Sequence, residues 1–327
     1  MQILVWAGFL LFILLMLAID LGVFHKEAHV VTIREALTWV CVWVSLSLVF
    51  NVLIYFLYTH HWLGFGQTVG HDVSGREAAL MFFTGYIIEY SLSMDNIFVI
   101  ALIFAYFRVP DIHQHRVLFW GILGAVVMRG IMIGLGTALI QRFEWIIYIF
   151  GALLIATAVK MMLAGTEQPH PDKNPLVRLA RKLYPVTSDF VGKHFFVIEK
   201  GRRAMTPLFI TLIVVENTDL LFAVDSIPAI FAITTDPFLV FTSNVFAILG
   251  LRSLYFALAG LMDKFRDLKS SLVFILAFVG VKMLLTHLYE IPTLFSLAVV
   301  AGILVVGIGA SLLAARREEK SARYPME

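Results

Sequence analysis

Nine long runs of apolar residues follow one another along the chain, and they constrain its fold more than any other feature. An α-helix needs about 20 mostly apolar residues to cross the roughly 30 Å hydrocarbon core of a bilayer. The predicted spans are residues 3–23, 36–58, 78–107, 118–140, 145–164, 206–233, 240–262, 271–288 and 293–314. Membrane β-strands are shorter and alternate in polarity, unlike these runs. The sequence therefore predicts an all-α polytopic membrane protein.

Composition excludes several functional classes. The 327 residues are 60% hydrophobic and only 15% charged, too apolar for a soluble protein. A net charge of +2 gives no reason to expect a nucleic-acid partner. Cys41 is the single cysteine, so an intramolecular disulfide, a CxxC redox pair and a thiolate metal cage are excluded. The sequence contains no nucleotide-binding loop, nucleophile elbow or HExxH motif, so we expect neither an ATP-driven pump nor an enzyme.

Basic residues are distributed unequally between the two sides of the membrane. Nineteen lysines and arginines fall in the odd-numbered connections and the C-terminal tail, and two fall on the other side. The positive-inside rule therefore predicts that the N-terminus faces out and the C-terminus faces the cytoplasm. Residues 165–205 hold eight of these basic residues and four prolines, which indicates a cytoplasmic loop near anionic lipid.

A pattern of charged residues occurs twice. An acid, five residues, a second acid, a small polar residue and isoleucine make up both 89–97 and 219–227. Further along, a Leu-Gly pair near an arginine and then a Val-Lys-Met triplet recur in the same order. The basic residues of these landmarks lie inside spans, where charge is costly and indicates function: Arg129, Lys160, Arg252 and Lys282. For Lys160 and Lys282, snorkelling to the membrane interface is an equal alternative.

The two copies of this pattern begin from opposite sides of the predicted membrane. They therefore form inverted three-helix repeats, an architecture of secondary transporters with a substrate site near the midplane. The expected organisation is two N-terminal helices within 1–58, a first repeat 78–164, a basic loop 165–205, an inverted second repeat 206–288 and a last helix 293–314 with a basic tail. Gly85 and Pro228 are positions where a helix of the site is expected to break.

The intramembrane acids predict a cation site. Left alone in hydrocarbon they would repel one another, and a bound multivalent cation, or protons, would relieve this repulsion. Oxygen ligands suit Mg²⁺, Ca²⁺ or Mn²⁺. Glu89 and Asp95 are six residues apart, so they converge only across a helix break or act as successive stations. The alternative is that the acids form ion pairs with the intramembrane bases and hold the fold together. Mixed roles are expected, with arginines holding the acids of the site in place.

At these residues the chain resembles the TerC family of integral membrane proteins. The resemblance is carried by residues 89–98 and 215–229 and continues through 236–238, 242–244 and 247–252. It implies a multi-pass protein of the bacterial inner membrane. Members of the family are implicated in Mn²⁺ export, are associated by name with tellurite resistance, and have been labelled redox modulators. By motif, the implied metal-site residues are Glu89, Asp95, Asn96, Glu216, Asp219, Asp225 and Ser226.

Together these features predict a secondary transporter that exports Mn²⁺ from the cytoplasm, with protons as the coupling ion. Three alternatives stay open. In the first, the transported ion is another divalent cation such as Ca²⁺ or Mg²⁺. In the second, the chain is a membrane partner that delivers metal to other proteins or stabilises them. The third, tellurite or oxyanion handling, conflicts with the acids, because an anion site needs helix N-termini and unpaired arginine.

Overall fold

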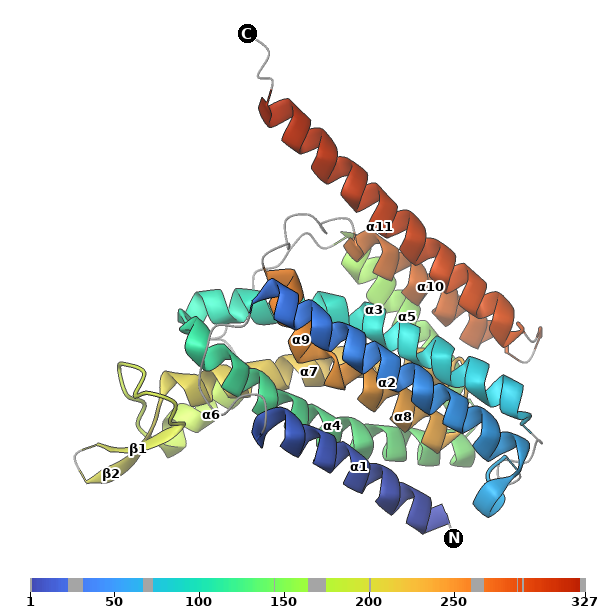
Figure 1. The fold of residues 1–327 in the computed structure, drawn as a ribbon, viewed down its shortest axis with the longest axis horizontal. Coiled ribbons are helices and arrows are strands. Elements are labelled where there is room, and N and C mark those ends of the chain that lie inside the picture. The colour runs from blue at the N-terminus through green and yellow to red at the C-terminus, as the bar shows by residue number, and fades with distance from the viewer. Residues whose placement is uncertain are drawn as a thin grey trace.

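The computed structural model is a bundle of helices with one small sheet at one end (Figure 1). It describes residues 2–22, 32–66, 73–143, 145–163, 175–199, 201–259, 268–286, 288–289 and 291–323. The α-helices are α1 Gln2–Gly22, α2 Ile33–Thr59, α3 Gly75–Phe107, α4 Asp111–Arg142, α5 Ile146–Leu163, α6 Pro175–Leu183, α7 Pro207–Phe231, α8 Pro237–Leu249, α9 Leu251–Ala259, α10 Leu268–Leu285 and α11 Thr293–Arg323. A short 3₁₀ helix, η1, covers Trp62–Gly64, and strands β1 Phe196–Glu199 and β2 Arg202–Met205 pair antiparallel.

The helices have the length and composition of membrane spans. Within the described residues, seven helical stretches are long and apolar enough to cross a bilayer, and α8 and α9 form one of them, Pro237–Leu258. Shorter apolar stretches occupy 5–18 of α1 and 270–285 of α10. The prediction of an all-α multi-pass membrane protein is therefore confirmed. Each of the nine predicted apolar runs coincides with helical structure. That all nine cross the membrane remains a prediction.

The centre of the bundle is α8. Every residue from Phe238 to Leu249 is buried, including the polar residues Thr242, Ser243 and Asn244. The outer helices α1, α2 and α11 instead expose large apolar side chains such as Leu11, Val49 and Val306. An outward-facing apolar surface of this kind suits lipid rather than water.

The N-terminus of α8 is held by Asp236. Its Oδ1 accepts hydrogen bonds from the backbone N–H groups of Phe238, at 2.9 Å, and Leu239, at 3.4 Å. Its Oδ2 accepts a 2.7 Å hydrogen bond from the hydroxyl of Tyr58 on α2. Pro237 occupies the first helical turn, where its missing N–H costs nothing. The buried start of α8 is therefore fully satisfied and is tied to α2.

Two pairs of helices run antiparallel through the bundle (Figure 1). The late part of α3 packs in one apolar cluster with the early part of α7, and the early part of α3 packs with the late part of α7. The early part of α4 meets α9, which follows α8, and the late part of α4 meets the start of α8. Helices α5 and α10 cross closely at Gly151 and Gly280, where a Cβ on Gly280 would lie 2.8 Å from Ile155 Cγ1.

The expected helix breaks are not where they were predicted. Helix α3 runs unbroken through Gly85, whose missing side chain instead admits Ser243 of α8: a Cβ there would lie 2.9 Å from Ser243 Oγ. Pro228 lies in the last turn of α7, which ends at Phe231. The interruption falls at Gly250, between α8 and α9. Packing between neighbouring helices, which local sequence does not encode, decides whether a glycine bends a helix or lets another helix approach.

Residues 165–205, predicted as a loop, contain regular structure in their described part. Helix α6 and the β1–β2 hairpin lie at the end of the bundle where α7 begins (Figure 1). The backbone of Met205 exchanges hydrogen bonds with Pro185 and Thr187, each 2.8 Å long. Val177 of α6 packs with Met205 and Leu208. This region is therefore docked on the first turn of α7.

Candidate functional site

The guanidinium of Arg129 forms the centre of a buried polar cluster between α3, α4, α7 and α8. Arg129 is only 1% exposed. Its Nη2 donates to Asp219 Oδ1 at 3.0 Å, its Nε donates to Asp219 Oδ2 at 3.3 Å, and its Nη1 forms an ion pair with Glu89 Oε1. The same Nη1 lies 3.3 Å from Ser226 Oγ and 3.2 Å from Asn244 Oδ1. The guanidinium of Arg129 therefore joins two acids that occupy matched positions in the two repeated motifs.

Glu89 is completely buried on α3. Its Oε1 also accepts a 3.3 Å hydrogen bond from Ser93, one turn along α3. Its Oε2 accepts a 3.1 Å hydrogen bond from the side-chain amide of Asn244. Asn244 thus bridges Glu89 and Arg129, donating to the first and accepting from the second. The cost of burying a carboxylate is offset by these donors.

The charge of the cluster is not balanced. With both carboxylates ionised, Glu89 and Asp219 carry two negative charges against the single positive charge of Arg129. Charges interact strongly in the low-dielectric interior of a membrane protein. The cluster is therefore suited to hold an additional positive charge, either a proton or a cation.

Asp225 lies apart from Arg129, although it is on the same helix as Asp219. Its Oδ1 accepts a 2.8 Å hydrogen bond from Thr157 of α5. Lys160, on the next turn of α5, is exposed and acts electrostatically on the Asp225 carboxylate. Asp219 and Asp225 are six residues apart on a continuous helix, so their side chains point in different directions.

Two further candidate ligands contain buried acceptors without a hydrogen-bond partner. Glu216 lies against α4 at Gly124, where a side chain in place of the glycine would overlap the Glu216 carboxylate. The Oε2 atom of Glu216 is buried and has no hydrogen-bond partner. Asn96 is 3% exposed and its Oδ1 is likewise unpaired. Buried acceptors are normally satisfied, so such groups indicate a missing donor, water or ion.

A small cavity lies next to the cluster. Its volume is about 20 Å³, and its lining includes Asp219, Arg252 and the small residues Gly121 and Ala125. This is room for one water molecule or one dehydrated ion. Arg252, on α9, is 4% exposed. The cavity therefore lies directly beside Asp219.

The structure brings together part of the predicted metal site. Glu89, Asp219 and Ser226 share contacts with Arg129, whereas Asn96, Glu216 and Asp225 have other surroundings. The side chain of Asp95 lies outside the described part of the structure. Among the described side chains, no three histidine, cysteine, aspartate or glutamate residues gather closely enough to hold a metal ion. The seven-residue ligand set therefore remains a prediction.

The other intramembrane bases have separate environments. Lys282 of α10 is 8% exposed and donates a 3.0 Å hydrogen bond to Ser296 of α11, so it is buried in protein rather than extended to an interface. Lys160 is exposed. The expected ion pairing of acids with bases is therefore seen at Arg129, where it involves two acids at once.

Sequence reasoning did not single out two residues of the site. Asn244 bridges Glu89 and Arg129, and Thr157 donates to Asp225. An asparagine in the middle of an apolar span is a signal that could have found the first. A threonine commonly bonds to the backbone of its own helix, so Thr157 carried no comparable signal.

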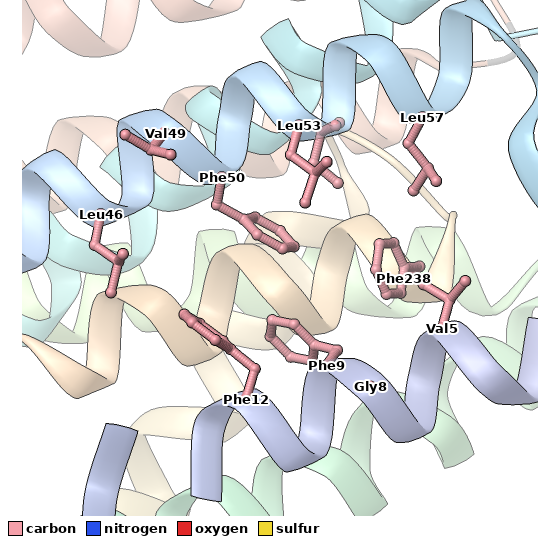
Figure 2. Close-up of a pocket in the computed structure, with 11 residues that line it drawn as sticks. Val5, Gly8, Phe9, Phe12, Leu46, Val49, Phe50, Leu53, Leu57 and Phe238 are labelled. Atoms are coloured by element: carbon pink, nitrogen blue, oxygen red, sulfur yellow. The ribbon is translucent and has the colours of Figure 1, made fainter. Parts of the chain in front are cut away.

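A second hollow lies on the outside of the bundle. It is a groove of about 440 Å³ between α1 and α2, with Phe238 at its base (Figure 2). The labelled residues that line it, including Phe9, Phe50 and Leu53, are all apolar (Figure 2). It offers no group for binding a cation, so the polar cluster is the better candidate site.

The fold and the site define an integral multi-pass membrane protein with a charged polar centre buried between its helices. The sequence profile described as "Integral membrane protein TerC family" matches residues 74–319. This chain belongs to the TerC family.

Several relatives are similar over nearly their whole length. The chain is 51% identical over 316 residues to "Uncharacterized membrane protein STKORF319" of Myxococcus xanthus, covering 97% of this chain and 94% of that protein. It is 50% identical over 304 residues to "Putative membrane-bound redox modulator Alx" of Escherichia coli K12, covering 93% and 92%. A Rickettsia bellii membrane protein is 41% identical over 308 residues, covering 94% and 97%. No solved structure matches the chain.

Proposed function

We propose that this protein is a secondary transporter that exports Mn²⁺ from the cytoplasm across the bacterial inner membrane. The observation that carries the proposal is the convergence of Glu89 and Asp219 on Arg129. These acids occupy matched positions in the two repeated motifs but come from different helices. A shared, buried and negatively charged centre between two repeats is the kind of site that secondary transporters use.

The arrangement of the helices supports inverted repeats. Matching α3 with α7 and α4 with α8 pairs helices that run in opposite directions. The packing is reciprocal: α3 contacts α8, and α4 contacts α7. The third members of the repeats, α5 and α10, pack against each other. Exchanging the two repeats therefore preserves the principal contacts, as expected for two halves that rock about a common site.

Arg129 gives the site a positive charge when no metal is bound. Its guanidinium occupies the space between Glu89 and Asp219, so an incoming cation reaches both carboxylates only after this side chain has moved. Glu216 and Asn96 offer unpaired oxygens on the helices that flank the cluster. We infer that the cation exchanges with Arg129 and with protons at these carboxylates, which would couple export to the proton gradient.

The ligand chemistry supports a hard divalent cation. All the candidate ligands are carboxylate, amide or hydroxyl oxygens, which favour Mn²⁺, Mg²⁺ or Ca²⁺ over Zn²⁺ or Cu⁺. Mn²⁺ is preferred because of the family resemblance. An oxyanion is disfavoured because Arg129 is engaged by two acids. The name of the Alx relative refers to redox chemistry, for which this chain, with one cysteine, offers no dithiol.

Mn²⁺ flux into proteoliposomes containing the purified protein tests the proposal. The native protein is expected to carry Mn²⁺, whereas Glu89→Gln and Asp219→Asn lose the flux because each removes a charge of the site. Glu77→Gln is the matched control, since Glu77 is an exposed acid in the first turn of α3. Absence of flux from well-folded native protein would contradict transport and favour a role in delivering metal to other proteins.

The coupling ion is tested in the same proteoliposomes. Reversing the pH gradient should reverse the direction in which Mn²⁺ accumulates, because each metal ion exchanges with protons. A Mn²⁺ flux that is indifferent to the pH gradient would reject proton antiport and leave transport intact. Competition by Ca²⁺ or Mg²⁺ at equal concentration then identifies the preferred ion.

A further inference from the structure

Helix α6 has a face of exposed apolar side chains. Leu176, Leu179 and Leu183 are spaced by three and four residues and therefore share one face of the helix. Their exposed fractions are 43%, 54% and 66%. In a segment outside the membrane spans, three exposed leucines on one face would be unfavourable in water.

The residue that fixes α6 to the protein lies on a different side of the helix. Val177 is 1% exposed and packs with Met205 and Leu208, at the point where α7 begins. Consecutive residues of a helix are about 100° apart, so this contact holds the helix by its flank. The leucine face is thus exposed, while Val177 attaches α6 to the start of α7.

The opposite side of α6 is basic. Arg178, Arg181 and Lys182 occupy it, and the helix contains no acidic residue. A short helix with leucines on one face and arginine or lysine on the other is typical of segments that lie in a membrane interface. The basic residues would extend to anionic headgroups while the leucines enter the acyl region.

The depth of α6 agrees with such a position. Its neighbours Met205 and Leu208 flank Pro207, the first residue of a candidate membrane span. Phe195, the residue before β1, contacts α4: its ring centroid lies 6.5 Å from that of Trp120, a 43% exposed tryptophan. Exposed tryptophans favour the level of the lipid headgroups. Helix α6 therefore lies beside the edge of the bilayer rather than far above it.

We propose that α6 is an interfacial helix that inserts Leu176, Leu179 and Leu183 into the bilayer and binds anionic lipid through its basic face. Because α6 lies in the connection between α5 and α7, this contact attaches the junction of the two three-helix units to the membrane surface. The proposal goes beyond metal transport and does not depend on which ion is carried.

The test places a fluorescent label at Leu183→Cys, with Arg178→Cys as the matched control on the opposite face of the same helix. Both are made in a Cys41→Ser background, because Cys41 is exposed. The full-length protein is reconstituted in nanodiscs of phosphatidylcholine, with or without phosphatidylglycerol. Quenching is measured with brominated acyl chains, which report the bilayer interior, and with iodide, which reports water.

The expected result is loss of fluorescence at position 183 with brominated lipid and protection from iodide, with the reverse at position 178. Phosphatidylglycerol should increase the loss at position 183. Equal iodide quenching at both positions would overturn the proposal. Protection from iodide without quenching by brominated lipid would also overturn it, because it would mean that protein, such as a second copy of the chain, covers the leucines. Indifference to phosphatidylglycerol would overturn the role of the basic face.

Discussion

Arg129 decides whether Glu89 and Asp219 can stay buried as carboxylates. A buried ion pair contributes little net stability, but removing one partner leaves an uncompensated charge. We expect Arg129→Met to lower the free energy of unfolding by about 3–5 kcal/mol, measured by thermal unfolding in detergent. The double variant Arg129→Met/Asp219→Asn should be more stable than the single variant, because it removes one of the stranded charges. Native-like stability of Arg129→Met would contradict this role of Arg129.

Asn244 is predicted to matter as much as a charged residue. Asn244→Leu removes the donor to Glu89 Oε2 and the acceptor for Arg129, leaving a buried carboxylate oxygen unsatisfied. The expected loss of stability is about 1–3 kcal/mol. Its neighbour Ser243 provides the control: Ser243→Ala loses only a bond to the backbone of its own helix and should have little effect. Similar melting temperatures for the two variants would contradict this role of Asn244.

Among whole elements, the close crossing of α5 and α10 depends on glycine. A side chain at Gly280 would meet Ile155 at 2.8 Å and the carbonyl oxygen of Gly151 at 3.0 Å. Gly280→Leu should therefore separate the helices and lower stability by about 1–3 kcal/mol. Gly302→Leu on α11, where nothing lies within 4 Å, is the control and should be tolerated. Equal thermal stability of both variants would show that the crossing adjusts without cost.

The start of α8 depends on the side chain of Asp236. Asp236→Ala removes the N-cap of the central helix and the acceptor of the Tyr58 hydroxyl. The expected cost is about 0.5–2 kcal/mol for the cap, with more for the stranded hydroxyl. Tyr58→Phe separates the two effects, because it keeps the cap and loses only the link to α2. If Tyr58→Phe proved as destabilising as Asp236→Ala, the cap would not be the main contribution of this aspartate.

For the whole molecule, the proposed orientation in the membrane can be tested directly. Trp62, between α2 and α3, and Lys193, beside the β-hairpin, are exposed residues at connections predicted to lie on opposite sides. In a Cys41→Ser background, an impermeant maleimide should label Trp62→Cys in intact cells and label Lys193→Cys only after lysis. Labelling of Lys193→Cys in intact cells would reverse the topology and, with it, the proposed direction of export.

The membrane helices and the paired acidic motifs could be predicted from the amino-acid sequence. Long apolar runs specify helices locally, because in lipid each helix must satisfy its own backbone hydrogen bonds. The spacing between the two acids of each motif, which begin at Glu89 and Asp219, is likewise a property of the sequence alone. Because both features are local, the class of protein could be predicted without knowing how the helices pack.

Only the tertiary structure decided which charged groups meet. Arg129 pairs with Glu89 and Asp219 because four helices converge, and Asn244 enters the same cluster from the central helix. Gly85 and Gly124 admit neighbouring side chains rather than breaking their helices. Such contacts depend on the rotation and close approach of helices far apart in sequence, which packing against neighbours fixes and local composition does not.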